Sequence, residues 1–155
     1  MNTIARSVVK SFSETFPAHH PKLFFSPGRI NLIGEHIDYN DGFVMPAAIN
    51  KGVYYAISEN QTEDIHFYAA DFDEHFSVSI DDIKSNGSWR NYVLSVVNEF
   101  LLLEKKVTVF NCVFAGNILL GSAMSSSAAV EGGLDLALNE LYNVGLNRVE
   151  LVLLC

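Results

Sequence analysis

The chain has 155 residues, 49% of them hydrophobic and 18% charged, which is enough apolar material for the core of one domain and argues against disorder. Its formal net charge of −8 removes the cationic surface on which nonspecific nucleic-acid binding depends, so we expect no nucleic-acid partner. The two cysteines, Cys112 and Cys155, do not form a disulfide framework and no apolar stretch reaches membrane-spanning length, so we expect a cytoplasmic protein without a membrane partner.

The first half of the chain is predicted to contain one helix followed by short strands. Apolar residues recur at helical spacing from about residue 3 to 16, and Pro17 ends this helix. Strand-like segments follow, namely KLFF, RINLI, GFVMPAAI, VYYAIS and DIHFYAA. The acidic run of Asp71, Asp73 and Glu74 is predicted to be a solvated turn, and residues 76–81 alternate with the period of a strand.

The second half is predicted to be mainly helical. In WRNYVLSVVNEFLLLEK, residues 89–105, the apolar side chains share one helical face that includes Trp89 and Tyr92. VTVFNCVFAG has the β-branched and aromatic composition of a strand. A helix from Ser125 to about residue 142 is stopped by Asn143 and Gly145, and a last helix occupies NRVELVLLC. Because most strands precede the helices, the order predicts an α+β domain.

A polar cluster in RINLIGEHIDY is the first candidate site. Glu35, His36 and Asp38 offer hydrogen-bond acceptors and a donor within four residues, which suits the several hydroxyls of a sugar. Arg29 adds a planar guanidinium that suits a carboxylate or a phosphate. Two other interpretations stay open: a surface turn with an incidental ion pair, and a metal site, although the spacing fits no standard one.

The serine run in LLGSAMSSSAAVEGG is the second candidate site. It lies between a predicted strand and a predicted helix, where backbone amides without helical partners and the helix dipole favour an anion such as a phosphate. Serine hydroxyls also suit a phosphate-bound Mg²⁺ ion. The alternative is that Ser125 or Ser126 only caps the helix.

Three segments together resemble the galactokinase family. PGRINLIGEHIDYNDGFVMPAAI is similar to the galactokinase signature, GSAMSSSAA is similar to the phosphate motif of the wider superfamily with homoserine, mevalonate and phosphomevalonate kinases, and WRNYV is similar to the segment between them. The resemblance implies an α+β fold like domain 2 of ribosomal protein S5, with a mixed sheet and its helices packed on one side. It also implies that residues 1–155 are an incomplete N-terminal galactose- and ATP-binding kinase domain without the C-terminal domain.

The resemblance assigns a role to each matching residue. Arg29 corresponds to the catalytic arginine, and Glu35, His36 and Asp38 to the residues that hold the galactose hydroxyls. Trp89 and Tyr92 correspond to residues near the adenine pocket, and Ser127 to a Mg²⁺ ligand. The loop around the ATP phosphates corresponds to Gly121, Ser122, Ala123, Met124, Ser125, Ser126 and Ser127. The implied reaction transfers the ATP γ-phosphate to the anomeric hydroxyl of α-D-galactose and gives galactose 1-phosphate.

The chain departs from the family pattern in two ways that affect the expected nucleotide affinity and activity. Leu119 and Ala123 stand where the family has proline and glycine, so we expect weakened nucleotide affinity. The family's catalytic aspartate lies downstream of the matched residues, so we expect the 155-residue chain alone to be inactive and to self-associate through its apolar last helix. A non-catalytic galactose and ATP sensor, and a kinase for a related sugar such as N-acetylgalactosamine, are the alternatives.

Overall fold

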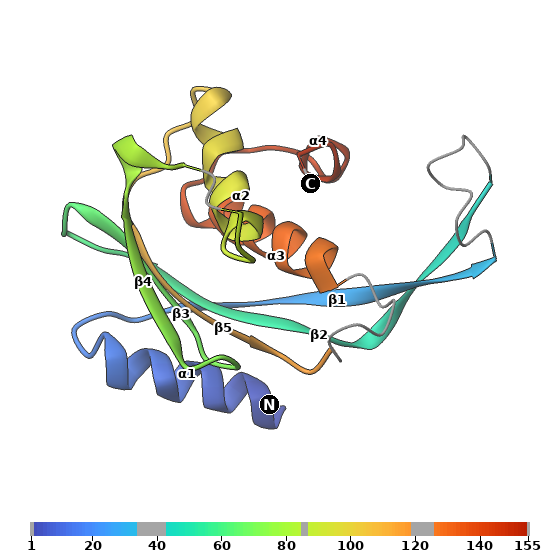
Figure 1. Ribbon diagram of the computed structural model, residues 1–155, viewed down its shortest axis with the longest axis horizontal. Helices are drawn as coiled ribbons and strands as arrows, with labels where there is room; N and C mark the ends of the chain where they lie inside the picture. The colour runs from blue at the N-terminus through green and yellow to red at the C-terminus, as the bar shows by residue number, and fades with distance from the viewer. Residues whose placement is uncertain (1, 34–42, 85–86, 119–125, 155) are drawn as a thin grey trace.

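The computed structural model describes residues 2–33, 43–84, 87–118 and 126–154 (Figure 1). Its strands are β1 (Lys22–Ile33), β2 (Met45–Glu59), β3 (Asp64–Ala69), β4 (Glu74–Ser79) and β5 (Phe110–Gly116). Its α-helices are α1 (Thr3–Thr15), α2 (Asn91–Leu102), α3 (Ser126–Leu141) and α4 (Arg148–Val152), and one 3-10 turn, η2, covers Ile80–Asp82.

The strands form one five-stranded mixed sheet in the order β1-β2-β5-β3-β4. β5 lies between β2 and β3, antiparallel to β2 and parallel to β3, while β1 with β2 and β3 with β4 are antiparallel pairs. The expected α+β class with a mixed sheet is therefore confirmed.

The two faces of the sheet carry different helices (Figure 1). Along β2, Tyr55 and Ile57 belong to the large core under α2 and α3, whereas Ala56 belongs to a smaller core with Val8 and Phe12 of α1. This division follows from the period of two along a strand, which sends neighbouring side chains to opposite faces. The expectation that all helices pack on one side is wrong for α1, because its own apolar stripe covers the second face of the sheet.

The predicted elements are mostly found, and their boundaries differ where a strand continues through an irregularity. KLFF and RINLI are parts of the single strand β1, whose pairing with β2 shifts register between Pro27 and Arg29. α3 ends as predicted, with left-handed backbone at Asn143 (φ 52°) and Gly145 (φ 82°). α4 begins with a capping box in which Asn147 and Glu150 satisfy each other's backbone amides.

The far ends of β1 and β2 extend past β5 as a two-stranded arm (Figure 1). Ile33 pairs with Met45 near its end, and the side chains of this region are open to solvent, with Ile33 68% and Phe43 97% exposed. The last helix also presents an apolar surface, since Val152 is 72% and Leu153 78% exposed. The apolar end that was expected from the sequence is present, and self-association stays a prediction. Within the described part of the chain, no helix combines the length and hydropathy that a membrane crossing requires.

Candidate nucleotide and sugar site

The helix that follows the serine run is fixed tightly to the sheet. α3 begins at Ser126, and the hydroxyl of Tyr55 on β2 donates a hydrogen bond of 2.7 Å to the carbonyl oxygen of Val130 in the second turn. A Cβ atom on Gly133 would lie 2.4 Å from the Tyr55 ring and 2.8 Å from the Cβ of Ser26 on β1. Only glycine permits this approach, so α3 lies directly against β1 and β2.

The same two strands lead into the polar cluster. Arg29 is an exposed residue of β1 opposite Ala48 of β2, and β1 ends four residues later at Ile33. Ser127 is half-buried in the first turn of α3. The strand that carries Arg29 and the helix that carries Ser127 are therefore in contact. The other predicted ligand-binding positions lie outside the described residues, as does Leu119. They are Glu35, His36, Asp38, Gly121, Ser122, Ala123, Met124, Ser125 and the side chain of Ser126.

A mainly apolar cavity of about 180 Å³ opens beside the start of α3. Four segments meet there: β2, the turn between β3 and β4, the end of β5 and α3. The lining residues are Val53, Asp71, Phe72, Phe114, Gly116, Ile118 and Val130. Asn117 fixes the end of β5 to β2. Its side-chain Oδ1 accepts a hydrogen bond of 2.9 Å from the backbone N–H of Gly52, and its backbone N–H donates to the Gly52 carbonyl oxygen. These two hydrogen bonds hold in place the backbone of β2 and of the end of β5, which form part of the cavity wall.

Trp89 lies behind the wall of this cavity. Its ring centroid is 5.3 Å from that of Phe72 and 6.1 Å from that of Phe114, the two aromatic residues of the lining. Tyr92 is 45% exposed on α2 and does not line the cavity. The prediction that Tyr92 shares the buried face of its helix is wrong, because Leu94 takes part in the core instead.

The acidic run 71–74 forms the predicted turn, with Asp71 and Asp73 exposed, and its carboxylates also accept hydrogen bonds from neighbouring segments. The Asp71 carboxylate accepts from the Gly116 amide at 2.7 Å, and Asp73 accepts from the Tyr68 hydroxyl at 3.0 Å. Glu74 pairs with Arg90 and accepts from the Trp89 indole. The sequence signal that was missed is Phe72, an apolar residue among acids, which belongs to the cavity wall.

Burial shifts the pKa of two groups where α3 meets the sheet. Burial raises the pKa of Tyr55 well above its usual value, with smaller contributions from Cys112, Asp135 and Glu131. Burial also raises the pKa of Glu131, one turn after Ser127. Both shifts reflect the burial of side chains where α3 packs on the sheet.

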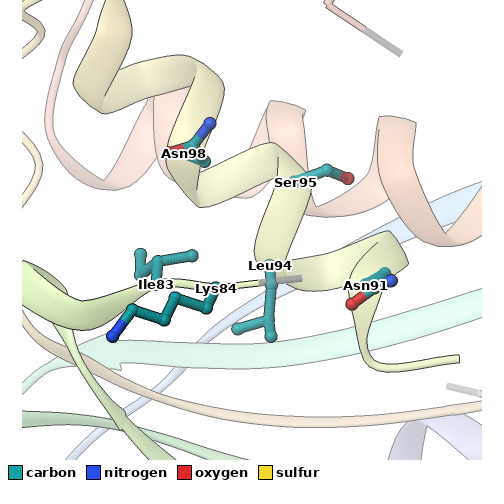
Figure 2. Close-up of a pocket in the computed structure, with 6 residues that line it drawn as sticks. All are labelled: Ile83, Lys84, Asn91, Leu94, Ser95 and Asn98. Atoms are coloured by element: carbon teal, nitrogen blue, oxygen red, sulfur yellow. The ribbon is translucent and has the colours of Figure 1, made fainter. Parts of the chain in front are cut away.

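A second cavity, of about 200 Å³, lies between α2 and the segment after η2 (Figure 2). Ile83, Lys84, Asn91, Leu94, Ser95 and Asn98 line it, and none of these is a predicted site residue. Within residues 2–33, 43–84, 87–118 and 126–154, no three His, Cys, Asp or Glu side chains gather in a way that could hold a metal ion. The role of Ser127 as a ligand of a phosphate-bound Mg²⁺ ion stays a prediction.

Two family models match the chain in succession. Residues 10–59 match the galactokinase galactose-binding signature, and residues 91–155 match the GHMP kinases N terminal domain. The galactokinase of Clostridium acetobutylicum is 37% identical over 94% of this chain, and that of Ligilactobacillus salivarius is 40% identical over 91%. The chain spans 39% and 38% of the length of these two relatives.

Solved structures agree with these matches. The structure of Lactococcus lactis galactokinase complexed with galactose has a TM-score of 0.91 and 33% identity over 98% of this chain, which covers 41% of that protein. Mevalonate kinase from Methanococcus jannaschii has a TM-score of 0.77 over 88% of this chain and 44% of its own; at 22% identity it supports the fold alone. On its sequence and its fold, the chain belongs to the galactokinase family and corresponds to an N-terminal part of these kinases.

Proposed function

We propose that this chain binds galactose and ATP and forms the N-terminal part of a galactokinase, which transfers the ATP γ-phosphate to the anomeric hydroxyl of α-D-galactose. The observation that carries the proposal is the close structural match, over nearly the whole chain, to a galactokinase complexed with galactose. The departures at Leu119 and Ala123 keep the alternative of a sensor protein open, and an N-acetylgalactosamine kinase is the other alternative that the titrations below test.

The cavity beside α3 supports the nucleotide part of the proposal. Its apolar walls with Phe72 and Phe114 suit the flat face of an adenine base. Val130 belongs both to the cavity and to the helix that follows the serine run, so a base in the cavity leaves its phosphates near the α3 N-terminus. Residues 121–127 would hold these phosphates, and Ser127 would serve as a ligand of the Mg²⁺ ion.

The strand β1 supports the sugar part. We assign the galactose hydroxyls to Glu35, His36 and Asp38, which follow β1 directly, and the transferred phosphoryl group to Arg29. The contact between β1 and α3, where Gly133 approaches Ser26 closely, supports assigning the two halves of the proposed site to neighbouring elements. Phosphoryl transfer depends mainly on positioning and charge neutralisation, which a rigid strand and a helix N-terminus both provide.

Calorimetric titration of the purified chain with galactose, with N-acetylgalactosamine and with Mg-ATP tests the proposal. We expect galactose and Mg-ATP to bind and to raise Tm, because ligands that bind only the folded state stabilise it. Asp38→Asn is expected to weaken galactose binding and to leave Mg-ATP binding intact. Preference for N-acetylgalactosamine, or no binding of either sugar, would refute the assignment to galactose.

Turnover is tested separately by incubating the chain with galactose and ATP and assaying galactose 1-phosphate. We expect binding without turnover, because the family resemblance places the catalytic aspartate downstream of the matched residues. Sustained product formation by the chain alone would contradict this expectation, although it would support the assignment of substrates.

A further inference from the structure

Glu74, the first residue of β4, uses both of its carboxylate oxygens to join two neighbouring residues before α2. Its Oε1 accepts from the Arg90 guanidinium through Nε at 2.8 Å and through Nη2 as well, and its Oε2 accepts from the Trp89 indole Nε1 at 3.1 Å. The Arg90 guanidinium also stacks on Phe76, with its carbon 4.8 Å from the ring centroid. The cluster of Glu74, Trp89 and Arg90 is called the clamp below.

The clamp determines where the indole ring of Trp89 lies. A half-buried indole N–H without an acceptor costs free energy, so the bond to Glu74 favours one orientation of the ring. In that orientation the ring meets Phe76 edge-on, at 5.8 Å and 81°, and packs against Phe72 and Phe114. The bidentate guanidinium limits the freedom of the carboxylate in turn.

Phe72 depends on this packing more than Phe114 does. Phe114 is a β5 residue and only 5% exposed, so its position is set by the core, whereas Phe72 lies in the turn between β3 and β4 and is 48% exposed. The Trp89 ring covers one side of Phe72, and the cavity lies at another. A shift of Trp89 would therefore displace the aromatic wall of the cavity.

We propose that Glu74 is a positioning residue for nucleotide binding: together with Arg90 it fixes Trp89, which holds Phe72 in place as the wall against which the base packs. This inference rests on the proposed function, because it takes the occupant of the cavity to be the base of ATP. None of the three clamp residues lines the cavity, so the effect on the nucleotide passes through Phe72.

The chain contains a single tryptophan, so its intrinsic fluorescence reports on Trp89 alone. In Glu74→Gln, an NH₂ group takes the place of one carboxylate oxygen, so either Trp89 or Arg90 faces a donor in place of its acceptor. We expect a red-shifted emission, stronger quenching by acrylamide, and an Mg-ATP Kd raised about tenfold, as for the loss of one charge-assisted hydrogen bond. Galactose affinity should stay within twofold, since the sugar is assigned to residues after β1.

Two further variants separate positioning from a general loss of stability. Arg90→Lys keeps the charge and the bond from Trp89 to Glu74 but loses the fork, so its Kd for Mg-ATP should lie between those of the wild type and Glu74→Gln. Glu14→Gln is the matched control: it makes the same chemical change in an exposed ion pair with Lys10 on α1, on the other face of the sheet. It should leave both emission and affinity unchanged.

The outcomes distinguish this inference from the proposed function. If the wild-type chain binds no Mg-ATP, the proposed function is wrong and the inference fails with it. If the wild type binds Mg-ATP and Glu74→Gln binds equally well, the inference alone is overturned. Equal loss of galactose and Mg-ATP affinity would also overturn it, since that result indicates a structural role of Glu74 in the whole domain.

Discussion

The hydroxyl of Tyr55, on a fully buried side chain of β2, lies 2.7 Å from the carbonyl oxygen of Val130, so one hydrogen bond ties the centre of the sheet to the start of α3. Tyr55→Phe should lower the free energy of unfolding by about 1 kcal/mol. In a chain of this size that corresponds to a Tm about 2–4 °C lower, measurable by thermal denaturation followed by circular dichroism.

The neighbouring tyrosine provides the control for this change. The Tyr54 hydroxyl accepts a hydrogen bond from Asn2 at an exposed position, so Tyr54→Phe should change Tm by less than the buried substitution does. If the two variants have the same Tm, the hydrogen bond from Tyr55 to Val130 does not stabilise the domain as we describe.

Gly133 is the point of closest approach between α3 and the sheet. Gly133→Ala adds a methyl group whose position is 2.4 Å from the Tyr55 ring, so strain of about 1–3 kcal/mol should exceed the gain of about 1 kcal/mol in helix propensity. Chemical denaturation should show a lower midpoint. Ala128→Gly, at an exposed position of the same helix, is the control for helix propensity and should also lower the free energy of unfolding. A Gly133→Ala variant that is more stable than the wild type would contradict the close packing.

Glu131 makes stability depend on pH in an unusual direction for a carboxylic acid. Burial raises its pKa in the folded state, so the folded protein binds more protons than the unfolded one, and stability falls as pH rises through the unfolded value of 4.5 towards the raised value. Glu131→Gln should therefore raise Tm at pH 7 and leave it unchanged at pH 3. A higher Tm of the variant at both pH values would show that charge is not the cause.

Ala123 is predicted to limit nucleotide affinity, because the family has glycine at the equivalent position of the phosphate loop. Ala123→Gly should lower the Kd for Mg-ATP, by up to about tenfold if the loop needs a backbone conformation that alanine resists. Calorimetry with Mg-ATP measures the change, and galactose titration serves as the control. An unchanged nucleotide Kd would refute the role given to this methyl group.

The sequence predicts the elements of this domain better than their arrangement. Apolar spacing locates α1 and α2 and indicates β4, because amphipathic periodicity is a local property. It does not show that α1 covers the opposite face of the sheet, or that Tyr92 is exposed while Leu94 is buried, because these depend on which surfaces meet. The length of the two long strands is not predicted from local sequence either, because Gly28 and Gly52 indicate breaks but lie within β1 and β2.

In the candidate site, too, the sequence predicts some features and only the structure shows others. Motifs identify the polar cluster and the serine run, and the packing of α3 on β1 then joins the elements that carry Arg29 and Ser127. The cavity was not predictable, because Phe72, Phe114 and Val130 come from three distant segments and look like ordinary core residues. The clamp was missed for the same reason, since Glu74 and Arg90 are 16 residues apart.

The position of β5 has a consequence for how the domain forms. β2 and β3 follow each other in the chain but do not pair, because β5, about forty residues later, lies between them. Until that strand arrives, the earlier residues can make two separate hairpins and nothing larger. During synthesis the sheet therefore closes late, around a strand that is buried from Phe110 to Ala115, and the slow, cooperative step of folding is expected to be the insertion of residues 110–116.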